Sequence, residues 1–174
     1  MDYAKVYGEM HAARPKAFSG FSIKHHVDAI AGLVAEIEPT RLLDYGSGKG
    51  YQYLALRVHE RWGGMVPHCY DPGVRQLREK PEGQFQGVIC TDVMEHIEEK
   101  DVSGILADIF GFVDLEARAF VYFCIACRPA KRKRLPDGRD VHVTIKPPAW
   151  WNRKIKPFER DWLTIRVVYD QGAK

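Results

Sequence analysis

Apolar and polar positions follow two different periods along the chain. Apolar residues that recur every three or four positions predict helices over residues 25–37, 51–61 and 101–112. Pro147 and Pro148 begin a further helix over 149–155, because proline is tolerated in a first turn. Short apolar runs between these segments predict strands over residues 41–45, 65–70, 85–91, 119–127 and 162–169.

This alternation of strands and helices predicts an α/β fold. The strand at 119–127 is apolar at nearly every position, as strands buried on both faces of a parallel sheet are. We therefore expect three layers, with helices on both faces of a parallel sheet, and a last strand at 162–169 that runs antiparallel. A length of 174 residues without repeat or linker indicates a single domain.

The apolar stretches are too short to cross a membrane. The longest, residues 119–126, falls far short of the roughly 20 residues that a spanning helix needs. Charged residues interrupt the first 16 positions, which therefore lack the apolar centre of a secretory signal. We predict a cytoplasmic protein without membrane contact.

Positive charge is concentrated in one segment. The net charge is +3, yet five basic residues fall within seven positions, at Arg128, Lys131, Arg132, Lys133 and Arg134, so the rest of the chain sums to −2. Such a block is either a solvated loop or an anion-binding surface. The block opens the segment 128–146, directly after a predicted strand, where α/β sheets bind their ligands. Its position therefore favours anion binding.

Three glycines alternate after the first strand. Gly46, Gly48 and Gly50 lie where the strand 41–45 passes into a helix, and glycine allows close approach of the backbone to a ligand. The dinucleotide fingerprint G-x-G-x-x-G would need a third glycine at Tyr51, so the spacing fits NAD poorly. Asp44, two residues before the first glycine, would repel a pyrophosphate and suit a cationic ligand.

Residues 42–127 resemble the class I S-adenosylmethionine (SAM)-dependent methyltransferases, whose first motif is an acid followed by G-x-G-x-G. The resemblance implies a Rossmann-like sheet and SAM as cofactor, with Asp71 accepting hydrogen bonds from its ribose hydroxyls. The residues that would hold SAM are Asp44, Gly46, Ser47, Gly48, Gly50, Asp71, Thr91 and Asp92. Only 13 residues separate Asp71 from Phe85, so we expect the family's third strand to be reduced or missing. The adenine contacts are therefore not identifiable.

The segment Asp92-Val93-Met94-Glu95-His96 is similar to an acid-x-x-acid-His motif of small-RNA 2′-O-methyltransferases and of some ubiquinone-pathway O-methyltransferases. In those enzymes the motif binds a divalent metal ion, so the resemblance implies that Asp92, Glu95 and His96 hold Mg²⁺ or Mn²⁺. His142 would supply a further ligand or a general base. The alternative is that the motif only caps or packs a helix. Asp92, His96 and His142 are the catalytic candidates.

The basic segment lies where this family places its substrate loops. The turn at 136–138 would fold Arg139 and His142 back over the site. The residues that we predict to contact an anionic substrate are Arg128, Arg132, Arg134, Arg139 and Trp150. Trp150 alternatively packs in the core or at an interface. The N-terminal segment 1–24 is predicted to be either a lid over the cofactor or a helix packed on the sheet edge.

The sequence thus predicts a small SAM-dependent methyltransferase. Its expected substrate is an anionic or phosphate-bearing small molecule, such as a nucleotide or sugar derivative, methylated at oxygen or nitrogen. A second hypothesis is an RNA or DNA methyltransferase, and a third is a non-catalytic SAM-binding or partner-binding module. The acceptor atom and the oligomeric state are not predicted.

Overall fold

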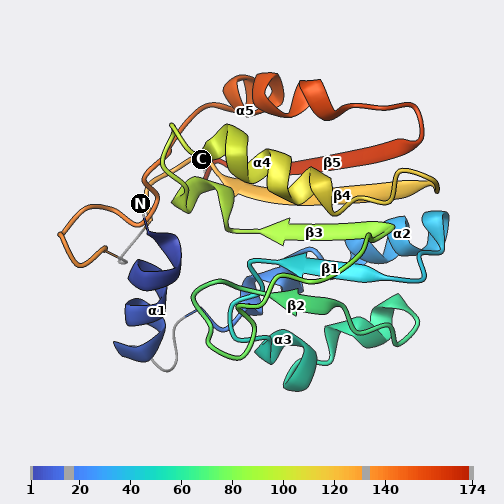
Figure 1. Cartoon of the computed structure of the whole chain (residues 1–174), viewed down its shortest axis with the longest axis horizontal. Helices are drawn as coiled ribbons and strands as arrows, with labels where there is room; N and C mark the ends of the chain where they lie inside the picture. The colour runs from blue at the N-terminus through green and yellow to red at the C-terminus, as the bar shows by residue number, and fades with distance from the viewer. Residues whose placement is uncertain (1, 14–17, 131–133, 173–174) are drawn as a thin grey trace.

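A computed structural model describes residues 2–13, 18–130 and 134–172 of the chain. Its centre is one sheet in which all strands run parallel, in the order β2-β1-β3-β4-β5 (Figure 1). The strands are β1 (Leu42–Tyr45), β2 (His68–Tyr70), β3 (Gly87–Thr91), β4 (Ala119–Ala126) and β5 (Leu163–Asp170). The α/β prediction and the positions of the strands are confirmed.

Helices cover both faces of this sheet. The α-helices are α1 (Tyr3–Ala13), α2 (Val27–Ile37), α3 (Tyr51–Leu54), α4 (Val102–Gly111) and α5 (Pro148–Ile155). Short 3₁₀ helices are η1 (Phe21–His25), η2 (Val58–Trp62), η3 (Met94–His96) and η4 (Lys156–Phe158). Residues of α4 and α5 share one hydrophobic core with the sheet, and residues of α2, α3 and η2 share another. The three expected layers are therefore present.

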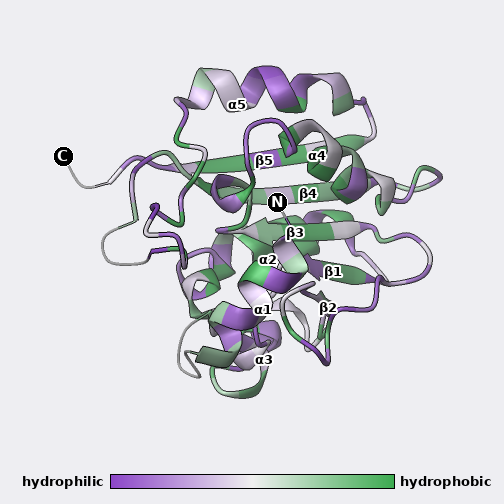
Figure 2. Cartoon of the chain, turned by 60° about the vertical axis from the view of Figure 1, so that its left-hand side comes forward, coloured by the Kyte–Doolittle hydropathy of each residue, from purple (hydrophilic) through white to green (hydrophobic). Residues whose placement is uncertain are grey.

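β4 divides its side chains between these two cores. Val121, Phe123 and Ile125 belong to the α4–α5 core, whereas Phe120 and Tyr122 belong to the α2 core. Successive side chains of a strand point to opposite faces, so a strand buried on both sides shows a continuous apolar run. Figure 2 shows the hydrophobic colour concentrated on the strands.

The prediction that the last strand runs antiparallel is wrong. β5 pairs in parallel with β4 along its whole length, from Leu163 beside Ala119 to Asp170 beside Ala126. The reason is the connection: residues 127–162 include α5 and carry the chain back to the amino end of β4 before β5 begins. A crossover through a helix delivers a parallel strand, whereas a tight hairpin would deliver an antiparallel one.

The segment between β2 and β3 adds no strand to the sheet. Residues 71–86, between β2 and β3, form turns and contain neither a helix nor a strand of the sheet. The helix expected over 51–61 is also interrupted, because Arg57 adopts a left-handed conformation (φ 49°) between α3 and η2. β2 is consequently an edge strand, and the loop after it contains no helix and no strand of the sheet.

α1 lies beside the carboxyl ends of the strands. In Figure 1 the arrowheads of the sheet point toward α1 and toward the loop after β4, and Figure 2 shows α1 in front of this edge. In the described part of the chain, no helix has the length and apolar character needed to cross a membrane.

Gly46 is placed where a side chain would not fit. Its φ is +76°, and a Cβ added there would approach Val93 Cγ2 to 2.3 Å. We expect Gly46→Ala to lower the free energy of unfolding by about 2–4 kcal/mol, from left-handed strain and overpacking together. Urea denaturation measures this change.

Gly104→Ala is the matched control. Gly104 lies in α4 and has no heavy atom within 4 Å of an added Cβ, so alanine should raise the free energy of unfolding by about 0.5–1 kcal/mol. Equal effects of the two substitutions would contradict the packing described for Gly46.

Candidate functional site

A cavity of about 360 Å³ opens at the carboxyl edge of the sheet. It lies where β1 leads to α3 on one face and the neighbouring β3 leads to α4 on the other, the position at which open α/β sheets bind ligands. Its volume is within the range of about 300–1,000 Å³ found for small-molecule sites. Predicted residues that line it are Gly46, Gly48, Asp71, Thr91, Asp92 and His96.

The amides of the glycine loop are bound within the protein. Gly46 and Ser47 donate to the Tyr70 carbonyl at 2.7 and 3.1 Å, and Gly48 donates to Asp71 Oδ2 at 2.8 Å. The Lys49 amide donates to the Phe18 carbonyl at 3.0 Å. The segment before η1 therefore lies directly on the loop, and a Cβ at Gly48 would meet the Phe18 oxygen at 2.4 Å. The predicted ligands Ser47 and Gly50 do not line the cavity.

The Asp44 carboxylate lies beneath the loop, outside the cavity wall. Its Oδ2 accepts hydrogen bonds from Tyr53 Oη at 2.8 Å and from Gln52 Nε2 at 2.9 Å. Burial raises the pKa of Asp44 to about 6, although both hydrogen bonds act in the opposite direction. Asp44 thus anchors α3 to β1, and its carboxylate does not face the cavity.

Asp71 does line the cavity, as predicted. Its Oδ2 accepts from the Gly48 amide and its Oδ1 from the Gly73 amide, both at 2.8 Å. Burial raises the pKa of this carboxyl to about 6. A carboxylate held by two backbone amides at the end of β2 has a fixed orientation, which suits it to accept hydrogen bonds from ligand hydroxyls.

The N-terminal segment is predicted to be a lid or a helix packed on the sheet edge. Its helix α1 forms one wall of the cavity through Tyr7 and His11. His11 Nε2 is 3.9 Å from Asp71 Oδ1, and its Nδ1 is buried without a hydrogen-bond partner among the described residues. Burial, with a smaller effect of Lys49, lowers the pKa of His11 to about 4, so this ring is neutral at pH 7. Residues 18–22 line the same cavity.

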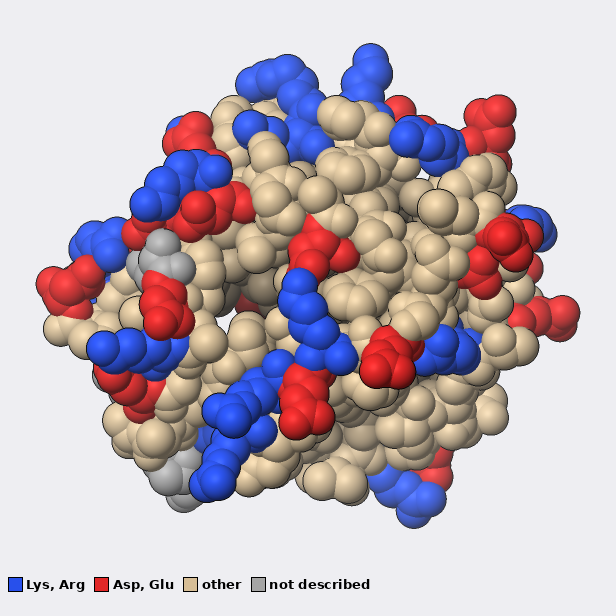
Figure 3. All heavy atoms as spheres, in the orientation of Figure 1, with Lys and Arg blue, Asp and Glu red and all other residues tan. Residues whose placement is uncertain are grey.

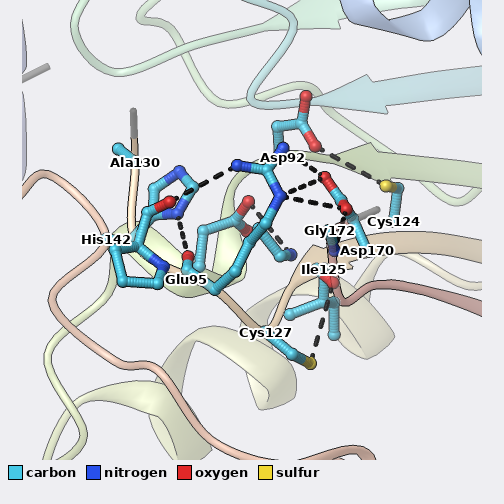
Figure 4. A network of polar contacts seen from close by, with 12 residues as sticks. Asp92, Glu95, Cys124, Ile125, Cys127, Ala130, His142, Asp170 and Gly172 are labelled. Carbon is cyan, nitrogen blue, oxygen red and sulfur yellow. Dashed lines mark hydrogen bonds and ion pairs between the residues drawn. The ribbon is translucent and has the colours of Figure 1, made fainter. Parts of the chain in front are cut away.

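The side chains of Glu95, His96 and His142 form a cluster close to Asp92. One potential ligand atom from each lies within 4.8 Å of the others. Figure 4 shows the Glu95 carboxylate beside the His142 ring, and the rings of His96 and His142 are 5.0 Å apart and perpendicular. The sequence grouped Asp92 with Glu95 and His96, but Asp92 adopts a left-handed conformation (φ 56°) and accepts from Cys124 Sγ at 3.5 Å instead.

The chemistry of this cluster fits a divalent metal ion. Glu95 is fully buried; its Oε1 accepts from the Ala126 amide at 3.2 Å, and its Oε2 has no hydrogen-bond partner among the described residues. Burial and the nearby charge of Asp92 raise the pKa of Glu95 to about 8. Glu95 therefore holds a proton at neutral pH when no cation is near, and a cation would displace that proton and compensate the buried negative charge. One carboxylate and two imidazoles are a common donor set for transition ions.

The arginines expected to bind substrate are paired with acids of the chain itself. Arg128 forms a bidentate pair with Asp170 (2.6 and 3.0 Å), which ties the end of β4 to the end of β5 (Figure 4). Arg134 pairs with Asp140 at 3.3 Å, and Arg139 pairs with Asp137 at 2.7 Å and with Glu98 at 3.4 Å. Arg132 lies outside the described residues.

Trp150 lies on α5, partly buried. The ammonium groups of Lys146 and Lys154 are 5.6 and 5.3 Å from the centre of its ring. Figure 3 shows acidic side chains interspersed among the basic ones over this view, with basic side chains prevailing at the top, where Figure 1 places α5.

Comparison of the chain with protein-family models, with curated proteins and with solved structures finds no match in any of the three. Function must therefore be inferred from the cavity and from the side chains around it.

The burial of Asp44 predicts a pH dependence of stability. Its pKa of about 6 in the folded chain is above the ordinary value near 4, so the folded state holds the proton more tightly. The resulting stability is complete below pH 4 and is lost as the pH rises through 6. Relative to Asp44→Asn, the unmodified chain should lose of the order of 3 kcal/mol of unfolding free energy between pH 4 and pH 7.

Chemical denaturation at several pH values measures this difference. The control is Asp28→Asn, because the Asp28 side chain is 82% exposed and solvent screens its charge in both states. Parallel stability curves for Asp44→Asn and the unmodified chain would show that Asp44 is not held in the buried position described.

Proposed function

We propose that this protein is a SAM-dependent methyltransferase with a Rossmann-like fold. The observation that carries the proposal is the cavity at the junction of β1 and β3, walled by the glycine loop and by carboxylates that follow two other strand ends. Asp71 would accept hydrogen bonds from the ribose hydroxyls, and Gly46 and Gly48 line the cavity beside it.

The charge of the cavity supports a cationic ligand over a dinucleotide. Asp71 and Asp92 line it, and the amides of Gly46, Ser47, Gly48 and Lys49 are bound to protein oxygens. A pyrophosphate needs free amides at this position, as in dinucleotide-binding loops. A sulfonium needs nearby negative charge, which the two carboxylates supply.

The substrate that we propose is an anionic or phosphate-bearing small molecule, such as a nucleotide or sugar derivative, methylated at oxygen or nitrogen. Methyl transfer is an in-line displacement, so aligning the acceptor atom with the methyl group provides much of the rate enhancement. Asp92, in the cavity wall, is suited to accept the proton of a hydroxyl acceptor. Arg128 follows the end of β4 at the same edge of the sheet.

Glu95, His96 and His142 would hold a divalent metal ion next to this cavity. The two imidazoles favour Mn²⁺ over Mg²⁺, which prefers oxygen ligands. When bound, such an ion supplies Lewis-acid polarisation of a hydroxyl. The chain's own contribution is the orientation of the ligands: the His142 Nδ1 hydrogen donates to the Arg128 carbonyl at 2.7 Å, which leaves the lone pair on Nε2.

An RNA or DNA substrate is the second candidate. The placement of Lys146 and Lys154 around the Trp150 ring favours it, because aromatic rings flanked by positive charge are typical of surfaces that stack nucleobases. The third hypothesis, a non-catalytic binding module, is motivated by the missing third strand.

We expect S-adenosylhomocysteine to bind this chain and NAD not to bind it, as measured by isothermal titration calorimetry. Asp71→Asn should weaken S-adenosylhomocysteine binding by about 10- to 100-fold, since hydrogen bonds to a charged group contribute about 1.5–3 kcal/mol. The control is Asp114→Asn, which lies near the amino ends of the strands and should leave the affinity unchanged. Equal binding of NAD, or an unaffected Asp71→Asn variant, would refute the assignment.

We expect Mn²⁺ to raise the thermal unfolding midpoint more than Mg²⁺ does. At a concentration 100 times the dissociation constant, binding adds about 2.7 kcal/mol to the free energy of unfolding. Glu95→Gln and His142→Ala should abolish the Mn²⁺ effect, whereas Glu99→Gln, whose side chain pairs with Lys146, should retain it. A Mn²⁺ effect that survives Glu95→Gln would place the ion elsewhere.

A further inference from the structure

α1 provides none of the candidate metal ligands Glu95, His96 and His142, but one of its side chains contacts this cluster. Residues one helical turn apart dock the helix on the carboxyl edge. Tyr3 Oη donates to Asp101 Oδ2 at 2.7 Å and accepts from the Glu98 amide at 2.9 Å. Tyr7 follows one turn later, with its ring perpendicular to the His96 ring and 5.7 Å from it.

The Tyr7 hydroxyl makes two contacts with His96. Tyr7 Oη lies 3.2 Å from His96 Nδ1 and 3.5 Å from the His96 carbonyl oxygen. We assign the hydroxyl hydrogen to the carbonyl, which can only accept, so that the phenolic oxygen accepts from Nδ1–H. A phenol keeps its hydrogen at neutral pH, so the hydroxyl has one hydrogen to donate. This arrangement leaves the lone pair of His96 on Nε2.

His142 is held in the same way by a different part of the chain. Its Nδ1 lies 2.7 Å from the Arg128 carbonyl oxygen, and Arg128 is fixed in turn by its bidentate pair with Asp170. Both rings therefore have Nδ1 bonded to an oxygen and a lone pair on Nε2. Histidines that bind metals almost always donate their second ring N–H to such a partner, and loss of that partner typically lowers metal affinity 10- to 100-fold.

We infer that Tyr7 is a positioning residue for the metal site formed by Glu95, His96 and His142. This inference rests on the metal binding proposed above. Tyr7 fixes the tautomer and the ring orientation of His96 through its hydroxyl. A helix from the beginning of the chain thus supports a site whose ligands lie some ninety residues later or more.

The test compares Tyr7→Phe with the unmodified full chain, using Mn²⁺ alone as the probe. Phenylalanine keeps the ring that packs edge-on against Phe18 and removes only the hydroxyl. Calorimetry should give a Mn²⁺ dissociation constant about 10- to 100-fold higher. The electron paramagnetic resonance spectrum of bound Mn²⁺ should change as well, because the orientation of one imidazole ligand is no longer fixed.

Tyr3→Phe is the matched control. It removes a hydroxyl from the same face of α1 and two hydrogen bonds that dock the helix, but it does not touch His96. Its Mn²⁺ affinity should equal that of the unmodified chain. Equal affinity in Tyr7→Phe, or an equal loss in both variants, would overturn the role of Tyr7 while leaving the metal site intact. An unmodified chain that binds no Mn²⁺ would overturn the site itself and the inference with it.

Discussion

Several carboxylates lie at one edge of the sheet. Removing them from water costs free energy, and the neighbouring segments are arranged so that donors or counter-charges reach them. Parallel strands all end at the same edge, so Asp44, Asp71, Asp92, Glu95 and Asp170 all lie along it. Buried acids are tolerated only where donors or counter-charges reach them. Those partners come from every neighbouring segment: α3 for Asp44, the loop amides for Asp71, β4 for Asp92 and Glu95, and Arg128 for Asp170. The Glu95 oxygen without a donor stands out against this pattern.

Much of the fold could be predicted from the sequence because the information is local. Apolar periodicity identified the strands, and the 13 residues between Asp71 and Phe85 were too few for another strand and its helices. The direction of β5 could not be predicted from its own residues. It depends on where the long connection after β4 returns the chain, and an alternating apolar pattern is the same in both directions.

The candidate site was only partly predictable, for the same reason. Gly46, Gly48, Asp71 and Asp92 follow strand ends directly, so their place at the cavity could be read from the chain. The loop position of His142 predicted that it could join Glu95 and His96. Tyr7, however, reaches His96 from the opposite end of the sequence, so no short motif contains that contact. Counting basic residues also misjudged the charge available to a ligand. Arg128, Arg134 and Arg139 each face an acid of the chain, and a sequence shows charges without showing their partners.

The close contact between Gly48 and the Phe18 carbonyl changes what the glycine motif means. A glycine-rich loop after a first strand is ordinarily interpreted as room left for a ligand. Here the chain's own backbone occupies that room, since the Phe18 oxygen would lie 2.4 Å from a Cβ at position 48. Glycine is therefore required at position 48 by the contact with the Phe18 carbonyl as well as by any bound molecule. A descendant of this protein that no longer bound a ligand would still need glycine at position 48. Retention of the glycine motif is therefore not evidence that the activity is retained.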